Sequence, residues 1–394
     1  MKTLCFEGYY TQRFAAYKEF CHEHVEVKID EFLKKFCNEW LQEEFTLQSG
    51  ADRYERSDKR IDRRNGHYRR RLITGRGVVE LKVPRGESKK YTYTLFKKNK
   101  RKTKGFEDIV VDALLKGLST RKASEFFANT FGAGTVSHQA ASSALKRFDL
   151  ELEVWRQKKI QDKAVVLILD AVHLKGVIRT YRQAKPVLFA YAVYEDGREE
   201  VLDFELVPGE SKNAWYRFCQ KLCDRGLRDA KLVVHDDNAA ISEAVSLVWP
   251  YALDQQCVFH ILKNFCKKLT GCQDKRKLLD DASRLYQAES EKEFHRLAQK
   301  FKVKWQRYMN HPALKYLFKM LPDSTKYFAL PKKFWKIAKT SNRLERLFEE
   351  LKRRIKVFRR FPNPKSCKRW LYALLKELNR ADLGCPLSKS QQSS

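Results

Sequence analysis

The chain has 394 residues, and its 80 Lys and Arg against 49 Asp and Glu give a formal net charge of +31. With 43% hydrophobic residues, it is too apolar for a disordered protein and long enough for several structural units. So basic a chain favours a polyanionic partner, above all nucleic acid, over a solubilising, ribosomal or membrane-surface charge. The absence of a long apolar run or signal peptide and the ten scattered cysteines predict an intracellular protein with reduced thiols.

Residues 1–52 are expected to form a helical N-terminal region. Large apolar side chains recur there at helical spacing: Phe14, Tyr17, Phe20, Phe32, Leu33, Phe36, Trp40 and Leu41. This pattern predicts a packed or dimerising helical pair rather than a ligand site.

A strongly basic region follows at 53–105, where Arg53 to Lys104 hold twenty Lys and Arg against five acids. Residues 72–74 and 78–83 flank Gly75-Arg76-Gly77 and predict a hairpin that ends at Pro84, and Asn65-Gly66 is a further turn signal. A solvated basic linker is the alternative, but exposed arginines on a hairpin suit contact with a phosphate backbone. The candidates are Arg63, Arg64, Arg69, Arg70 and Arg71.

Residues 106–155 have the breaks of a helix-turn-helix domain. A helix from Asp108 to Lys116 stops at residues 117–120, which begin a second helix to about Thr130, and Ser137 caps a third from His138 to about Phe148. The third helix would expose side chains that can meet base edges and phosphates in a major groove: His138, Gln139, Ser142, Ser143, Lys146 and Arg147. A purely structural helical bundle is the alternative.

The apolar pattern changes to that of strands in residues 160–262. Strands are expected at 164–172, 187–194, 201–207, 231–236 and 251–257, with helices at 211–225 and 238–248. The order β-β-β-α-β-α-β is that of an RNase H-like fold, a mixed α/β sheet flanked by helices. Residues 263–338 would be an inserted all-helical subdomain, residues 339–380 the final helices of the catalytic core, and residues 381–394 a disordered tail.

Three carboxylates occupy compatible places in this fold. Asp170 and Asp236 each end an apolar strand-like run, and Glu345 lies beside the apolar stripe of a basic helix capped by Ser341 or Asn342. Two divalent cations held by such carboxylates can promote in-line attack on a phosphodiester, and Mg²⁺ suits oxygen ligands. Taken singly, the aspartates would be turn residues and Glu345 a salt-bridge partner. Asp237 competes with Asp236, which we prefer because it follows the alternation of the strand.

Cys257 and His260 follow the fifth strand. With Cys266 and Cys272 they resemble a loose zinc knuckle, but the spacing is unusual. We expect Cys257 and His260 instead to lie near the carboxylates and to brace the site or position DNA.

Over roughly residues 55–380 the chain resembles a transposase of the Mutator-like superfamily, in its prokaryotic insertion-sequence branch. The resemblance rests on short motifs along the chain: residues 64–69 with 83–85, residues 116–121, residues 169–175, residues 208–211 with Trp215, residues 234–236, residues 256–260 and residues 342–347. The Cys-x2-His after the second Asp and the Asn-x2-Glu on a basic helix are together specific.

The resemblance implies a DDE recombinase whose triad is Asp170, Asp236 and Glu345, accompanied by Cys257, His260 and Asn342. Two Mg²⁺ ions, replaceable by Mn²⁺, would be the cofactors, and DNA cleavage and strand transfer the reaction. Terminal inverted repeats and target DNA would be the partners, with Arg346, Arg353 and Arg354 as further DNA contacts. The protein would act as a homodimer or higher oligomer in the cytoplasm, at the nucleoid. Asp237 after the second Asp, and Arg343 after Asn342, depart from the family pattern.

Two other functions stay open on the sequence. A defective or domesticated transposase could act as a sequence-specific DNA-binding regulator, and metal-dependent nicking would separate it from an active enzyme. A host RNase H-like nuclease or Holliday-junction enzyme would lack specific binding to element ends, and the helix-turn-helix and long insertion argue against it.

Overall fold

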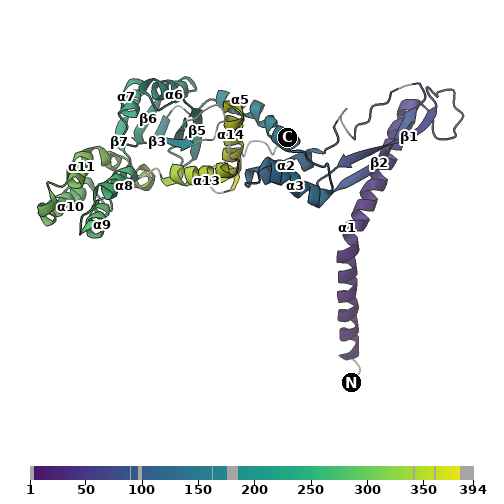
Figure 1. The fold of residues 1–394 in the computed structure, drawn as a ribbon, viewed down its shortest axis with the longest axis horizontal. Helices are drawn as coiled ribbons and strands as arrows, with labels where there is room; N and C mark the ends of the chain where they lie inside the picture. Colours follow the sequence, from purple (N-terminus) through teal and green to yellow (C-terminus); the bar gives the residue numbers. More distant parts are fainter. Residues whose placement is uncertain are drawn as a thin grey trace. The chain divides into compact units, whose positions relative to one another are not determined.

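The computed structural model describes residues 4–88, 90–95, 100–161, 163–174, 185–339, 342–358 and 361–381. These residues form two compact units, residues 1–144 and 145–394, each described by itself (Figure 1). Among the described residues, no helix combines the length and apolar character that crossing a membrane requires. The tail expected to be disordered lies, after Ala381, outside the described residues.

The first unit begins with one continuous helix, α1 (Leu4–Ser49), where a helical pair was expected. No proline or glycine interrupts residues 9–49, and the helix ends at Gly50, whose φ is +76°. A side chain at Gly50 would also collide with the Lys59 carbonyl oxygen. The positive φ of Gly50 therefore ends α1, and no residue between 9 and 49 interrupts it.

The predicted basic hairpin is present as β1 (Arg64–Ile73) and β2 (Val78–Gly86), paired antiparallel. The chain reverses at residues 74–77, where the Thr74 N–H donates to the Gly77 carbonyl at 2.8 Å. Leu72 pairs with Val79 across the strands, and both pack with Leu41 of α1. The reversal is thus where Gly75-Arg76-Gly77 predicted it. The further turn signal at Asn65-Gly66 is wrong as a reversal, because these residues lie within β1 at a register shift.

Three helices follow: α2 (Lys104–Leu115), α3 (Thr120–Phe131) and α4 (His138–Ala144). Thr103 and Ser119 cap the first two through their side chains. The rings of Phe106 and Phe127 meet at 5.4 Å between centroids. The third helix is shorter than predicted: after Ala144 the second unit begins with a 3-10 turn (Leu145–Arg147) and α5 (Phe148–Gln157).

The second unit is built on a five-stranded mixed sheet in the order β5-β4-β3-β6-β7. Its strands are β3 (Lys163–Leu174), β4 (Lys185–Val193), β5 (Glu199–Leu206), β6 (Asp229–His235) and β7 (Leu253–Gln256). The first three pair antiparallel, whereas β3, β6 and β7 run parallel. The predicted succession of strands and helices is therefore confirmed, with β3 at the centre.

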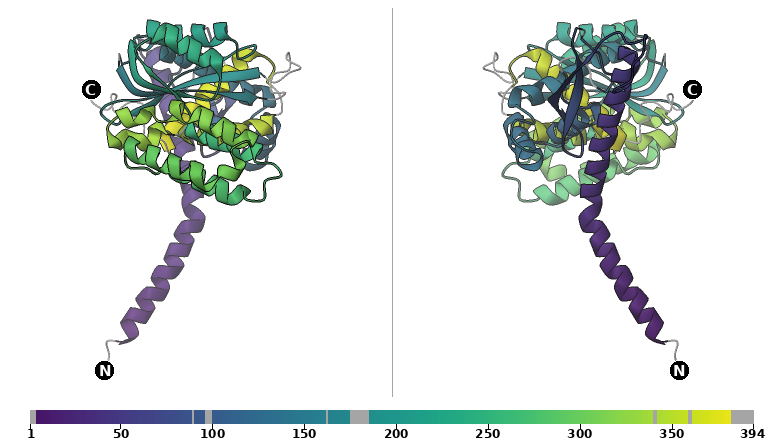
Figure 2. Two further views of the ribbon diagram at one scale, coloured as in Figure 1. Left: turned by 90° about the vertical axis from the view of Figure 1, so that its left-hand side faces the viewer. Right: turned by 90° about the vertical axis from the view of Figure 1, so that its right-hand side faces the viewer.

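Helices cover both faces of this sheet (Figures 1 and 2). On one face α6 (Lys212–Asp224) and α7 (Ala239–Val248) pack their Trp215 and Val245 into a core with Leu167. On the other face lie α13 (Asn342–Phe358) and α14 (Pro364–Ala381), and Phe348 of α13 contacts Phe189 at 5.1 Å between ring centroids. Two-sided burial explains why these strands are almost continuously apolar.

Between β7 and α13 the chain forms a helical block with its own core. The block comprises α8 (Val258–Lys268), α9 (Lys275–Leu285), α10 (Glu291–Lys304), α11 (Pro312–Met320) and α12 (Lys332–Ala338). Gln255 of β7 fastens it to the sheet: the Gln255 side chain donates to the Ala338 carbonyl and accepts from the Tyr327 N–H, both at 2.7 Å.

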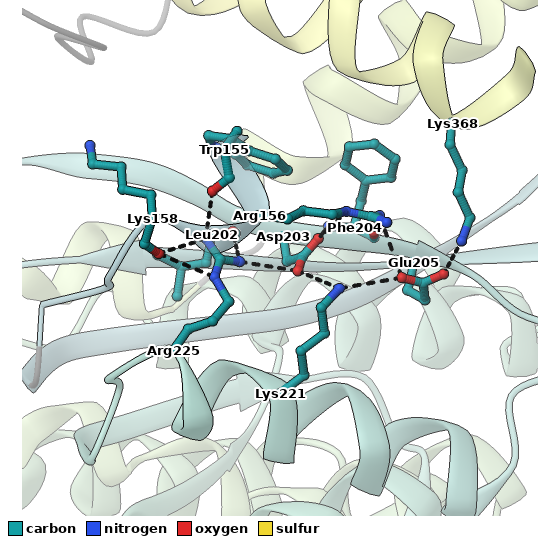
Figure 3. Close-up of polar contacts among 10 residues, drawn as sticks. All are labelled: Trp155, Arg156, Lys158, Leu202, Asp203, Phe204, Glu205, Lys221, Arg225 and Lys368. Atoms are coloured by element: carbon teal, nitrogen blue, oxygen red, sulfur yellow. Dashed lines mark hydrogen bonds and ion pairs between the residues drawn. The ribbon is translucent and has the colours of Figure 1, made fainter. Parts of the chain in front are cut away.

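A buried ionic network ties helices to the outer strand β5 (Figure 3). Asp203 is fully buried, and Lys221 of α6 and Arg225, the C-cap of α6, approach its carboxylate at 2.9 and 3.1 Å. Arg156 of α5 lies between Asp203 and Glu205, at 3.4 Å from each. Glu205 also pairs with a lysine of α14, Lys368. The network thus satisfies a charge that would be costly to bury alone.

Candidate active site

The first two predicted acids lie side by side because their strands are neighbours in register. The last parallel pair between β3 and β6 is Ile168 with Val234, and Asp170 and Asp236 each come two residues later. The sequence predicted that Asp170 would end its strand, but β3 continues to Leu174 and pairs there with β4. Asp170 therefore lies where β6 leaves the edge of β3.

Asp170 faces the side of the sheet that α13 covers, since its cross-strand partner Phe189 contacts α13. Its side chain is buried, and its Oδ1 accepts from the Ala171 N–H at 2.7 Å. Burial, followed by the negative charge of Asp236, raises the pKa of Asp170 to about 8. A carboxyl held in this way retains a proton at neutral pH unless a cation replaces it.

Asp236 has an oxygen available for a ligand. Its Oδ1 is buried and has no hydrogen-bond partner among the described residues. Its charge acts on Asp170, Glu210 and His260. Asp237 is exposed and acts instead on Tyr316 of α11, whose pKa is raised mainly by burial and further by Asp237. The surroundings therefore favour Asp236 over Asp237 as the inward-facing acid.

The residue before Asp236 braces the end of β6. His235 is buried, and its ring contacts the Asp236 carbonyl oxygen, the Asp254 carboxylate of β7 and the Ser242 hydroxyl of α7. Through His235, these contacts connect β6, β7 and α7 next to Asp236. The sequence reading missed this role, because Asp254 and Ser242 are brought to His235 only by the fold.

Glu345 reaches the same region from α13. Leu344, Leu351 and Ile355 are buried as the predicted apolar stripe, and this places the Glu345 carboxylate 3.5 Å from His260 Nε2. Burial raises the pKa of Glu345, although the positive charge of Lys263 opposes this effect. The charge of Glu345 also contributes to the raised pKa of Asp170. Strand, strand and helix thus bring three acids into electrostatic contact.

Cys257 and His260 lie beside these acids at the start of α8. Cys257 is buried, and its N–H donates to the His235 carbonyl at 2.7 Å. Burial lowers the pKa of His260, which keeps its ring neutral at pH 7, although Asp236 opposes the effect. His260 Nδ1 is buried without a hydrogen-bond partner among the described residues. The side chain of Asn342 lies outside the described residues.

The donor chemistry of this region suits a divalent cation, although no three His, Cys, Asp or Glu side chains of the described residues converge closely enough to enclose one by themselves. The residues of the loose zinc knuckle, Cys257, His260, Cys266 and Cys272, likewise do not converge on one point. Asp236 Oδ1, which has no hydrogen-bond partner among the described residues, and Asp170, which keeps its proton, can each offer an oxygen ligand to a cation. Carboxylates so arranged fit Mg²⁺, because Mg²⁺ takes few protein ligands and completes its shell with water and phosphate oxygens.

A fourth acid, Glu210, belongs to the same cluster, and the sequence reading gave it no role. It stands just before Ser211, the N-cap of α6. Its Oε1 lies 3.2 Å from His173 Nε2, and its Oε2 accepts from Asn238 Nδ2 at 3.2 Å. Its position after Pro208 and Gly209, before a capping serine, was the available signal.

The predicted DNA-binding residues differ in their exposure and in whether they form ion pairs or hydrogen bonds within the protein. Arg64 bonds to Gln42 and Thr46 of α1, Arg70 donates to the Lys100 carbonyl, and Arg354 pairs with Glu350 and Glu377. Arg353 is exposed but also pairs with Glu350. The other candidates are exposed: Arg63, Arg69, Arg71, His138, Gln139, Ser142, Lys146, Arg147 and Arg346. The exposed group is the better placed to meet phosphates.

Comparison with known proteins gives one consistent family. The family described as "Transposase, Mutator family" matches residues 10–381. The transposase for insertion sequence element ISRM5 of Rhizobium meliloti (strain 1021) is 32% identical over 357 residues, which cover 88% of this chain and 86% of that protein. The transposase for IS406 of Burkholderia multivorans is 30% identical, covering 89% and 90%. That for IS256 in transposon Tn4001 of Staphylococcus aureus is 26% identical, covering 87% of each.

A solved structure, the Mos1 transposase paired-end complex with left transposon end, matches over 56% of this chain and 81% of that chain. Its TM-score of 0.16 and identity of 12% are too low to carry an argument about the fold.

Proposed function

This chain belongs to the Mutator family of transposases, and we propose that it cleaves and joins DNA by a DDE mechanism at the terminal inverted repeats of its element. The observation that carries the proposal is the electrostatic contact of Asp170, Asp236 and Glu345, which arrive from β3, β6 and α13. The strand order β5-β4-β3-β6-β7, with helices on both faces, supports an RNase H-like catalytic core interrupted by a helical insertion.

Each acid has a distinct part in the proposed chemistry. Asp170 and Asp236, adjacent on the sheet, would hold Mg²⁺, and Glu345 would complete the site from α13. When bound, two divalent cations would activate the attacking oxygen and stabilise the leaving oxygen of the phosphodiester. Asp170 must release its proton to hold a cation, since its pKa is about 8. Neutral His260 beside Glu345 would orient that carboxylate.

DNA would be held by the basic surfaces of both units. The hairpin region 53–105 and the helices of 106–155 would contact the element ends, and the insertion and final helices would complete the catalytic core. The exposed Arg69 and Arg71 of β1 and the exposed His138 and Gln139 of α4 are suited to phosphate and base-edge contacts. Strand transfer at two ends requires two active sites, so we propose a dimer or higher oligomer on DNA, with α1 as a contact.

The test is cleavage of a labelled duplex that carries the element's terminal inverted repeat, in Mg²⁺ or EDTA. We expect nicking at the repeat boundary in Mg²⁺, loss of nicking in Glu345→Gln and Asp170→Asn, and unchanged end binding in both variants. Specific binding without nicking by the wild type would show a DNA-binding regulator instead. Unchanged nicking in Glu345→Gln would refute the triad.

A further inference from the structure

Glu210 joins the two strands that carry the aspartates. Its two carboxylate oxygens are used separately: Oε1 lies 3.2 Å from His173 Nε2 and Oε2 accepts from Asn238 Nδ2 at 3.2 Å. His173 comes three residues after Asp170 on β3, and Asn238 two residues after Asp236. One side chain at the start of α6 thus contacts the segments that follow both acids.

These segments need such a link because the sheet no longer holds them together. The β3–β6 ladder ends at Ile168 and Val234, so no backbone pairing joins the two strands at Asp170 and Asp236. Between Asp236 and α7 the chain turns sharply, with the Asn238 N–H donating to the Asp236 carbonyl at 2.7 Å. The Asn238 side chain also caps α7 through its Oδ1, which accepts from the Ala240 N–H at 3.0 Å.

Glu210 itself is well anchored. It directly precedes Ser211, whose hydroxyl caps α6 by accepting from the Ala214 N–H at 3.2 Å. Its side chain is only 18% exposed. Since α6 and α7 pack side by side on the sheet, a contact from the start of α6 to the cap of α7 sets the spacing of two rigid elements.

We propose that Glu210 is a positioning residue of the strand-cleavage site, acting as a bridge between His173 and Asn238 that fixes the separation of Asp170 and Asp236. This rests on the proposed function. The role requires hydrogen bonding at two points but not the negative charge. It therefore differs from the roles of Asp170 and Asp236, which require a carboxylate.

The experiment compares Glu210→Gln with Glu210→Ala in the full-length protein. Gln can accept from Asn238 and contact His173, so we expect it to retain most of the cleavage rate and the wild-type Mg²⁺ dependence. Ala removes both contacts, and we expect about a 10- to 100-fold lower rate, the loss that a small misplacement of reacting groups causes. Glu243→Ala is the matched control, because Glu243 forms an exposed ion pair with Lys212 on the same two helices.

Two further measurements separate positioning from general damage. In metal-free protein, amide hydrogen exchange at residues 236–240 should accelerate in Glu210→Ala and stay as in wild type in Glu210→Gln and Glu243→Ala. Asn238→Ala should also slow cleavage, and the combined loss in the double variant Glu210→Ala with Asn238→Ala should be smaller than the product of the two single losses, since the two side chains share one contact.

Equal loss of cleavage in Glu210→Gln and Glu210→Ala would overturn the proposal, because the charge itself would then be needed. Unchanged exchange and cleavage in Glu210→Ala would also overturn it. Neither outcome affects the proposed function, which fails if the wild type does not cleave or if cleavage survives substitution of Asp170, Asp236 or Glu345.

Discussion

At the scale of single residues, the site places acids where burial and mutual repulsion oppose their ionisation. Asp170 shows this most clearly, since its pKa rises from the ordinary 3.8 to about 8. Its ionisation in the absence of a cation therefore costs folding free energy. Catalytic sites commonly hold such unfavourable groups, because the ligand or substrate relieves them.

Asp170→Asn should therefore stabilise the metal-free protein while abolishing cleavage. The unfolded chain loses the Asp170 proton near pH 4 and the folded chain keeps it to about pH 8, so wild-type stability falls, relative to the variant, as the pH rises between these values. We expect equal stability at pH 4 and an advantage on the order of 5 kcal/mol for the variant near pH 8. Urea unfolding in EDTA at several pH values measures the free energy of unfolding of both proteins. A difference between them that does not change with pH would contradict the burial of an ionisable Asp170.

The adjacent aspartates should behave differently. Asp236→Asn should lower the cleavage rate by at least about 100-fold, a loss of the size seen when a preorganised charge-stabilising group is removed, whereas exposed Asp237→Asn should retain most activity. Initial rates of nicking at saturating Mg²⁺ measure both. The opposite ranking would assign the metal to Asp237, although Asp237 acts on Tyr316 rather than on Asp170.

At the scale of elements, the network on β5 holds α5, α6 and α14 to the sheet. Burial alone would raise the pKa of Glu205, but the Lys368 hydrogen bond and the charges of Arg156 and Lys221 outweigh it and lower the pKa below its ordinary 4.5. A lowered carboxyl pKa contributes stability that is present above the unfolded value. This contribution is lost as the pH falls below about 4.5 towards the folded pKa.

Asp203→Ala should destabilise the second unit by about 3–5 kcal/mol, because it leaves buried cations without their carboxylate. Glu195→Ala is the matched control: Glu195 pairs with Lys231, but both are exposed, so its loss should cost less than about 1 kcal/mol. Thermal or urea unfolding at pH 7 compares the two. A small effect of Asp203→Ala would mean that water satisfies Arg225 and Lys221 in its absence.

At the scale of the whole molecule, the charge of +31 predicts DNA affinity that falls steeply with salt. A cation that is exposed and not bound to another side chain releases counterions most efficiently when it meets a phosphate. In β1, Arg69 and Arg71 should therefore contribute more to DNA affinity than Arg64, whose guanidinium binds α1. Position in a basic sequence run therefore does not by itself make an arginine a DNA contact.

Arg71→Ala should weaken DNA binding about equally for specific and non-specific duplexes. It should also reduce the slope of log K against log salt by about 1, as the loss of one phosphate contact requires. Fluorescence anisotropy between low and physiological salt measures this. Lys28→Ala, which removes an exposed cation paired with Glu31 on α1, is the control and should leave the slope unchanged; a similar change in both variants would mean that the contacts are not localised.

The sequence by itself determined the order of elements in the second unit, the hairpin and the apolar stripe that turns Glu345 inward. These features depend on local periodicity and on breaks in the chain, which a sequence displays directly. It also indicated the three acids, whose residue types and positions in apolar runs or on an amphipathic helix are visible without a fold.

Only the tertiary structure decided which side chains meet. Residues distant along the chain, such as His173, Glu210 and Asn238, become neighbours because β3 and β6 pair in parallel and α6 leads from β5 to β6 across one face of the sheet. The tertiary structure also decided which arginines form ion pairs within the protein. It decided as well that Asp236, and not Asp237, lies close to Asp170. Packing of separate elements sets these contacts, and local periodicity does not encode it.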